Sequence, residues 1–409
     1  MDSLPARRPR VTLAAMALCM CMQMIGFMMI SPLFALRLES FGAGVQALGM
    51  SASAFALAAM AAAPFMGVLA DRLGRRPIIL LSLAAYALAF SGYLFAASAW
   101  VFIVLRGLAG ALTAGLVPAM TSTVGDLASE NRRAQWIGIV MGAASVGWVV
   151  GPPLGGLLYD HLGYFAAFAA SIGMELGALL LAASMIRETH NAPVAPAKAR
   201  PGWAGSFRGL PALPVLALPL FLSFGVMFAW AFIEPPLMFY AYDDLGWSSS
   251  RLGAVLGAYG FACMFGEFVL ARLSDHLGRK PVLTLGLALF SAQFIGLLLF
   301  RDALWIAVSF VVAGLGNALF DPALSAHLLD VTPPDGTARI MGLKAAAGSI
   351  GNMLGPALVV LVTPISSPNI VFMAAGILAI ALALATALAL RVPRRTAAAP
   401  DFSDAAFTQ

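Results

Sequence analysis

Three charged residues interrupt long apolar runs of this sequence: Glu234, Asp321 and Arg106. A charge in hydrocarbon is destabilising unless it faces a partner or a hydrated cavity. Glu234 stands directly before Pro235-Pro236 and Asp321 directly before Pro322. Prolines remove helical hydrogen bonds and leave room for water. Carboxylates in such places can take up and release protons, and we predict that these three residues couple a reaction or movement to protons.

The surrounding sequence is that of a membrane protein. Of 409 residues, 61% are hydrophobic and 11% are charged, against roughly 25% charged in soluble domains. Apolar runs of about 20 residues, long enough to cross a bilayer, recur from end to end. We expect twelve membrane-spanning helices, at about 12–36, 47–70, 77–97, 100–123, 136–159, 163–186, 211–241, 249–271, 281–300, 303–327, 338–363 and 368–390.

The chain is duplicated. A shift of 204 positions aligns its two parts without a gap and pairs many unusual residues: Asp71 with Asp275, Gly74 with Gly278, Pro118 with Pro322, and Gly151-Pro152 with Gly355-Pro356. The charges inside the spans break this repeat: Glu234 pairs with Ile30, Glu267 with Ala63, Asp321 with Val117 and Arg106 with Phe310. We therefore predict an all-α protein of two six-helix halves, residues 1–186 and 210–391, joined by a linker at 187–209 and followed by a tail at 392–409.

Basic residues predict the orientation. Of the 24 Lys and Arg residues, all but five fall in the termini, the linker and the loops on one side of the twelve spans. By the positive-inside rule, both termini and the linker are cytoplasmic. We expect a multi-pass protein of the plasma (inner) membrane.

Two motifs resemble those of the major facilitator superfamily. The loop after the second span resembles its signature G-x-L-a-D-r-x-G-r-k, with matches at Gly67, Asp71, Arg72, Gly74, Arg75 and Arg76. The fifth span resembles the antiporter signature G-x-x-x-G-P-x-x-G-G, with Gly147, Gly151, Pro152, Gly155 and Gly156. Within that superfamily, the twelve spans and the antiporter signature are similar to those of the drug:proton antiporters, which include NorA-like and tetracycline exporters.

The resemblance implies roles for two of the charged residues. Glu234 aligns with the acidic residue that NorA-like exporters use for proton coupling, and Arg106 with an arginine implicated in the proton pathway. The first span has no carboxylate, where tetracycline exporters carry one, which argues against a tetracycline-specific transporter. Inside spans 8 and 11, Glu267 and Lys344 are expected to form an ion pair, and we assign no role to Glu175.

The motifs also have physical explanations. The charged loop and its repeat (Asp275, Gly278, Arg279 and Lys280) can latch one side of the protein, with Gly67 and Gly74 allowing close approach and a tight turn. The alternative is a simple positive anchor. Gly147, Gly151 and Gly155 recur every four residues on one helix face and admit a neighbouring helix, while Pro152 bends the helix.

Methionine, aromatic and amide side chains in three spans suggest a substrate cavity: Gln23, Met24 and Met28, then Met227 and Trp230, then Asn317. Thioethers adapt to varied ligands, and an indole can stack on a cation. Core packing or lipid contact is the alternative interpretation of such stripes.

These features together predict a proton-driven exporter of amphipathic, possibly cationic, small molecules that works as a monomer without cofactor, metal or nucleic acid. No G-x-x-x-x-G-K-[ST] nucleotide motif occurs in the sequence, and no nucleophile–base pair suggests an enzyme. An exporter of sugars or other metabolites would share the same scaffold, and a non-transporting membrane sensor is the alternative of another class.

Overall fold

The computed structural model describes residues 9–189, 211, 213–270, 273–333 and 336–390, and this part of the chain is helical throughout apart from short connections. The predicted linker at 187–209 lies almost wholly outside the described residues, as does the tail at 392–409. The helices of the first half are α1 (Pro9–Ile30), η1 (Ser31–Leu33), α2 (Phe34–Glu39), α3 (Val45–Leu73), α4 (Arg75–Phe95), α5 (Ala99–Thr113), α6 (Leu116–Leu127) and α7 (Glu130–Met185). Those of the second are α9 (Leu213–Phe239), η2 (Tyr240–Asp244), α10 (Ser249–Leu270), α11 (Leu273–Leu277), α12 (Arg279–Phe290), α13 (Ala292–Leu299), α14 (Ala303–Asp330), α15 (Thr337–Val362) and α16 (Pro368–Ala389).

Among the described residues, eleven helical segments are long and apolar enough to cross a membrane. One of them, at 135–185, contains Gly163 with a non-helical φ of 81° and ψ of 178°, so the chain turns back there and the segment holds two spans. Counting it twice gives twelve spans, as the sequence predicts.

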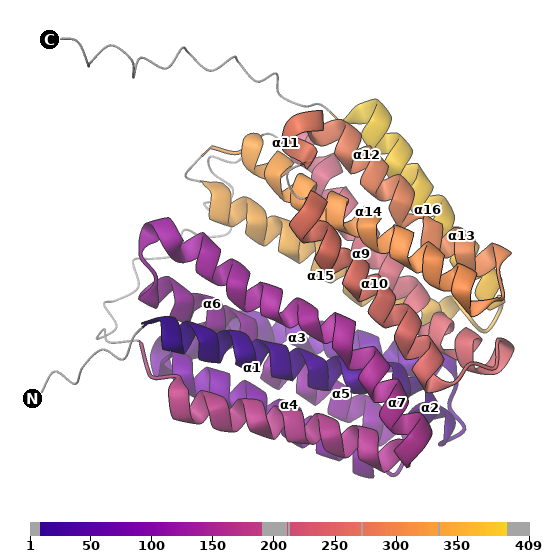
Figure 1. Ribbon diagram of the computed structural model, residues 1–409, viewed down its shortest axis with the longest axis horizontal. Helices are drawn as coiled ribbons and strands as arrows, with labels where there is room; N and C mark the ends of the chain where they lie inside the picture. The colour runs from indigo at the N-terminus through magenta and orange to yellow at the C-terminus, as the bar shows by residue number, and fades with distance from the viewer. Residues whose placement is uncertain (1–8, 190–210, 212, 271–272, 334–335, 391–409) are drawn as a thin grey trace, which may run out of the picture.

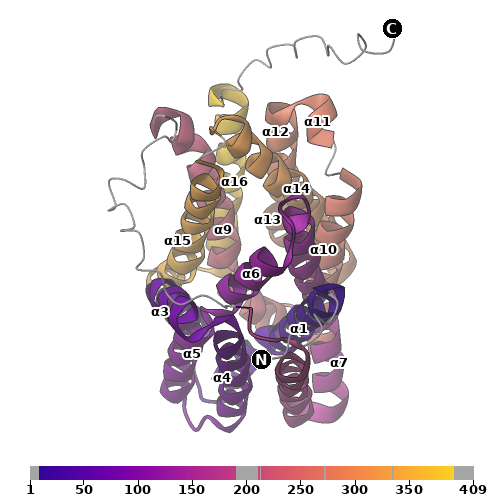
Figure 2. The same ribbon diagram turned by 90° about the vertical axis from the view of Figure 1, so that its left-hand side faces the viewer.

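The spans form two bundles that lie side by side in Figure 1, with the indigo-to-magenta helices α1–α7 below and the orange-to-yellow helices α9–α16 above. The helix ends at 73–75, 127–130, 277–279 and 330–337 lie with the start of α1 and the end of α16 at one end of the molecule, which we call the basic end. The other end is called the opposite end. Figure 2 views the molecule from the basic end, where the two bundles stand apart.

The two bundles join near the opposite end. Asp160 in α7 accepts hydrogen bonds from the backbone N–H groups of Ser249 (3.1 Å) and Ser250 (2.8 Å), which begin α10. The Tyr242 hydroxyl donates to the Pro32 carbonyl at 3.3 Å. A carboxylate at a helix N-terminus accepts hydrogen bonds from free N–H groups, and its negative charge interacts favourably with the positive end of the helix dipole. These contacts tie the halves together at this end.

Small residues allow helices of the two halves to pack closely against each other. A side chain at Gly253 or Gly260 of α10 would meet the backbone of Pro152 or Trp148 in α7, and a side chain at Gly49 of α3 would meet the Pro356 carbonyl of α15. Close backbone approach through small residues is the usual way that apolar helices associate. The joined region therefore runs from the opposite end to about the middle of the bundle.

Candidate functional site

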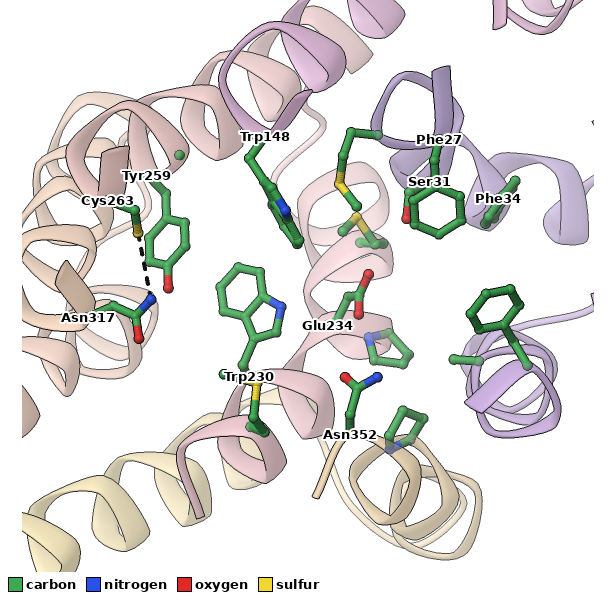
Figure 3. Close-up of a pocket in the computed structure, with 18 of the residues that line it drawn as sticks. Phe27, Ser31, Phe34, Trp148, Trp230, Glu234, Tyr259, Cys263, Asn317 and Asn352 are labelled. Carbon is green, nitrogen blue, oxygen red and sulfur yellow. Dashed lines mark hydrogen bonds between the residues drawn. The ribbon is translucent and has the colours of Figure 1, made fainter. Parts of the chain in front are cut away.

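A cavity of about 410 Å³ lies between the halves, near the middle of the molecule. Its wall is formed by side chains from both bundles and is largely apolar and aromatic. Figure 3 shows Phe27, Ser31 and Phe34 facing Trp230, Tyr259 and Asn317 across the cavity, with Glu234 between them. Arg106 and Glu267 also line it. An apolar chamber with a few charges is typical of small-molecule sites.

Glu234 points into this cavity from α9 (Figure 3). Pro235 and Pro236 stay within the helix, which passes into a single π-turn only at Tyr240–Asp244. Within the described part of the chain, the carboxylate makes no hydrogen bond or ion pair with protein. Arg106, on the wall contributed by the first half, is the charged group that acts on it electrostatically.

Arg106 lies in a cage of three phenylalanines. Its guanidinium carbon is 4.6 Å from the ring centre of Phe55, 4.9 Å from Phe34 and 5.7 Å from Phe27. The residue is only 6% exposed, and its Nε and Nη1 atoms have no hydrogen-bond partner among the described residues. Stacking on ring faces is a way to hold a poorly hydrated cation. Sequence analysis missed this cage, although the seven-residue spacing of Phe27 and Phe34 places them on one helix face.

The other wall is a stack of aromatic rings. Trp230 stacks on Tyr259 with ring centres 5.0 Å apart, and meets Trp148 edge-on at 6.5 Å (Figure 3). Trp148 and Tyr259 were not among the predicted cavity residues. Such rings offer both apolar area and a negative π-face to a ligand.

Four predicted cavity residues do line the cavity: Met28, Met227, Trp230 and Asn317. The Asn317 Nδ2 donates to the Cys263 Sγ at 3.9 Å. Two others do not. Met24 packs against Gly147 of α7, and Gln23 is buried with 3% exposure away from the cavity wall. The four-residue methionine spacing predicted one helix face correctly, but a packed helix presents only part of that face to the cavity.

A second cavity of about 730 Å³ adjoins the first, since both are lined by Phe55, Met227 and Asn352. It is also lined by Ala63 of α3 and Met341 of α15, so it extends toward the basic end. The halves are thus joined at one end and separated by a cleft at the other.

Asp321 and Lys344 line this second cavity as an ion pair, with Nζ 2.7 Å from Oδ1. Lys344 also donates to the Ser325 hydroxyl at 2.7 Å. The predicted pairing of Lys344 with Glu267 is therefore wrong: Glu267 lines the central cavity instead. Glu267 and Asp321 stand equally far from the starts of α10 and α14, so their positions along the helices do not decide which of them meets the lysine.

The signature loop and its repeat share one backbone turn. Gly74 (φ 104°) and Gly278 (φ 87°) both adopt the left-handed region that L side chains avoid. Gly67, however, lies inside α3 with nothing within 4 Å of where a Cβ would be, so the close approach predicted there is absent from this structure. Arg72 ends α3 and Lys280 begins α12.

Charges around each turn bind within their own half. Arg75 contacts Asp71 at 2.6 Å and Asp126 at 3.6 Å. Arg279 binds Asp330 at 2.9 Å and the Ser274 hydroxyl at 2.7 Å, while the Asp275 side chain lies outside the described residues. Each of these four contacts joins two residues of the same half.

Glu188, which sequence analysis did not identify, completes the first turn. Its carboxylate accepts the backbone N–H groups of Arg75 (2.9 Å) and Arg76 (3.1 Å) at the start of α4. The side chain of Arg76 in turn donates to the Ala183 carbonyl at 2.7 Å. The signature turn is thereby tied to the end of α7.

The antiporter motif packs on two neighbours. A side chain at Gly147 or Gly151 would meet Met24 or Met28, and one at Gly155 would overlap the Met29 backbone, all in α1. A side chain at Gly156 would instead overlap Ser249, at the start of α10 in the other half. Pro152 lies inside helix α7. The motif thus holds α7 against both its own half and the second.

The arrangement of two helical bundles around a central cavity agrees with a comparison of sequences. The profile described as Major Facilitator Superfamily matches residues 16–241 and again 220–408. The chain belongs to the Major Facilitator Superfamily. The identification made from the signature loop, the antiporter motif and the duplication is confirmed, and so is the predicted fold class of twelve helices.

Curated relatives within the superfamily include resistance proteins. The chain is 28% identical to the class G tetracycline resistance protein of Vibrio anguillarum over 320 residues, covering 75% of this chain and 78% of that protein. It is 27% identical to the multidrug resistance efflux pump PmrA of Streptococcus pneumoniae over 342 residues (80% and 83%). It is 25% identical to the quinolone resistance protein NorA of Staphylococcus aureus over 362 residues (86% and 90%).

A solved superfamily structure shares the fold. The human organic anion transporter MFSD10 (TETRAN) superposes with a TM-score of 0.68 at 22% identity, covering 94% of this chain and all of that one. The family match and the membrane-spanning helices identify the chain as a multi-pass membrane transporter of the superfamily.

Proposed function

We propose that this transporter is a proton-driven exporter of amphipathic, preferentially cationic, small molecules. The observation that carries the proposal is the unpaired Glu234 carboxylate inside an aromatic cavity between the halves. An apolar cation can be held by the rings of Trp148, Trp230 and Tyr259 while its charge is balanced by Glu234. A proton can balance the same charge, so cation and proton compete for one site.

The orientation of the basic end supports the direction of transport. The excess of Lys and Arg at this end favours a cytoplasmic location, and the cleft lined by Asp321 and Lys344 opens the site toward it. In this inward-open state, an ionised Glu234 would receive the substrate cation. After the halves rock to open the opposite end, proton uptake by Glu234 would release the substrate outside.

Arg106 would tune this competition. Its guanidinium lines the same cavity and attracts an ionised carboxylate but not a protonated one. Because three phenylalanine rings hold it on the first half, its distance from Glu234 changes when the halves move. Movement is thereby linked to proton affinity. No cofactor is required, since the proton gradient supplies the energy.

The test is extrusion of a lipophilic cationic dye, driven by a pH gradient, from liposomes containing the purified protein. We expect Glu234→Gln to abolish gradient-driven extrusion while dye still binds and exchanges without a gradient. Glu39→Gln, the same change at an exposed position near the opposite end, is the matched control and should transport normally. Full gradient-driven extrusion by Glu234→Gln would refute the assignment.

A further inference from the structure

Glu175, in the second span of α7, is the most completely buried acid of the described chain. Its exposure is 0%, and neither carboxyl oxygen has a hydrogen-bond partner among the described residues. It lies on none of the cavity walls described above. The proposed transport mechanism does not use it.

The carboxyl group is enclosed by helices of the first half. Its Oε1 atom is 3.3 Å from where a Cβ of Gly26 in α1 would be, and one turn earlier the Ser171 hydroxyl donates to the Gly26 carbonyl at 2.5 Å. A residue larger than glycine at position 26 would therefore press on Glu175. The contact between α1 and α7 is built around this acid.

Few ionisable groups face Glu175 from the packed helices. Cys19 of α1 interacts with it electrostatically, but its thiol donates to the Ala178 carbonyl at 3.4 Å. Tyr86 of α4 interacts electrostatically with Glu175, with Arg106 and with Tyr93, and its hydroxyl contacts Thr113 of α5. Tyr86 thus interacts with both the buried acid and the caged arginine.

Burial without a partner decides the protonation state in this conformation. An ionised carboxylate in such surroundings would be strongly destabilised by the loss of hydration, so Glu175 is held here as the neutral acid. Even a neutral polar group is destabilising when it is buried without a hydrogen bond. Stability alone thus gives no reason for an acid at this position.

We propose that Glu175 is a second proton-binding residue of the transport cycle, a conclusion that rests on the proposed proton-driven export. In the inward-open state its O–H bond is intact. When the halves rock with Arg106 still held in its cage, water entering from the cavity reaches α7, the O–H bond breaks, the proton passes to that water, and the carboxylate is hydrated. On the return movement the carboxylate takes up a proton from water, which restores the neutral acid.

This assignment differs from a structural role in what it predicts for glutamine. Glu175→Gln keeps the shape and neutrality of the buried group but cannot release a proton. A structural acid would be replaced without consequence. A proton carrier would leave substrate exchange intact and lose gradient-driven transport.

The experiment uses the reconstituted full chain and two readouts: dye extrusion driven by a pH gradient, and dye exchange at equal pH. We expect Glu175→Gln to reduce gradient-driven extrusion about a hundredfold, at the low end of the effects of losing a proton-transfer group, with exchange within about twofold of wild type. Glu39→Gln supplies the matched change at an exposed acid.

A spectroscopic readout makes the test independent of transport. Infrared difference spectra of the wild type in detergent, with and without dye, should contain the carbonyl stretch of a protonated carboxyl group without a hydrogen bond, and Glu175→Gln should remove that band. If Glu175→Gln does not fold, Glu175→Met, which is apolar and of similar length, repeats both measurements. Wild-type values for gradient-driven extrusion in a folded variant, or an unchanged carbonyl band, would overturn the proposal. Absence of gradient-driven extrusion by the wild type would instead refute the proposed function.

Discussion

The two halves of this transporter share their backbone plan but not their charges. Gly74 and Gly278 make the same left-handed turn, and Gly151 and its repeat Gly355 both admit the first helix of their own half. The charged residues inside the spans have no such counterpart. Arg106 repeats as Phe310, a fully buried ring. The two halves thus share the residues that position their helices, while each of these charges is present in only one of the two halves.

The halves also hold their charges in different surroundings. In the second half, Glu234, Glu267 and Asp321 all line a cavity. In the first, Arg106 reaches the central cavity only from within a cage of rings, and Glu175 is sealed between helices. Acids that face a cavity can meet substrate, whereas groups enclosed by packing respond mainly to helix movement. Substitutions that place one half's residue in the other half test this division.

The largest effect is expected where the repeat replaces glycine by a branched residue. Gly155 corresponds to Val359, so Gly155→Val introduces the residue of the second half. Its side chain would overlap the Met29 backbone, and we expect a loss of about 3 kcal/mol in stability. Gly142→Val, in the same helix with nothing within 4 Å of the Cβ position, is the control. Equal melting temperatures in detergent would show that α1 and α7 are not held as described.

Replacing Arg106 by its repeat residue should affect transport rather than folding. Arg106→Phe places a ring among Phe27, Phe34 and Phe55, so the fold should persist. Gradient-driven dye extrusion should fall about a hundredfold, as when a proton-transfer step loses its partner. Arg251→Phe, at an exposed arginine near the opposite end, should transport normally. Wild-type transport by Arg106→Phe would remove the arginine from the mechanism.

The Asp321–Lys344 pair can be exchanged for the two valines of the first half, Val117 and Val140. Each single change to valine leaves a charge without its partner, whereas the double change removes both. We expect the double variant to be more stable than the sum of the single effects predicts, by about 1 kcal/mol. Thermal unfolding of the four proteins in detergent measures this coupling energy. Strict additivity would mean that the ion pair does not stabilise this conformation.

The smallest difference is expected between the two signature turns. Alanine at Gly74 or Gly278 should destabilise the protein by about 1 kcal/mol, because both positions have positive φ. Only at Gly74 does the new methyl group also meet the Glu188 carboxylate, which caps α4. We expect Gly74→Ala to lower stability by about 1 kcal/mol more than Gly278→Ala. The reverse order would show that Glu188 does not contribute at this turn.

Sequence patterns predicted the fold more completely than the site. The positions of the spans follow from hydropathy, and the division into two halves follows from the repeat. Neither prediction requires knowledge of the tertiary structure. Four of the six residues predicted to line the cavity do so, namely Met28, Met227, Trp230 and Asn317. The other two, Gln23 and Met24, lie away from it. The prediction that Glu267 pairs with Lys344 was also wrong. A periodic sequence defines the faces of a helix but not which neighbour each face meets.

The sequence by itself determined that this chain crosses the membrane twelve times, that it is duplicated, and that Arg106, Glu234 and Asp321 are charges inside the spans that break the repeat. These properties depend on composition and spacing along one chain. The tertiary structure alone decided that Arg106 is caged by rings, that Asp321 binds Lys344, and that Glu175 is sealed without a partner. Those outcomes depend on how far each helix is rotated about its axis when it packs, and small residues on several helices set that rotation together.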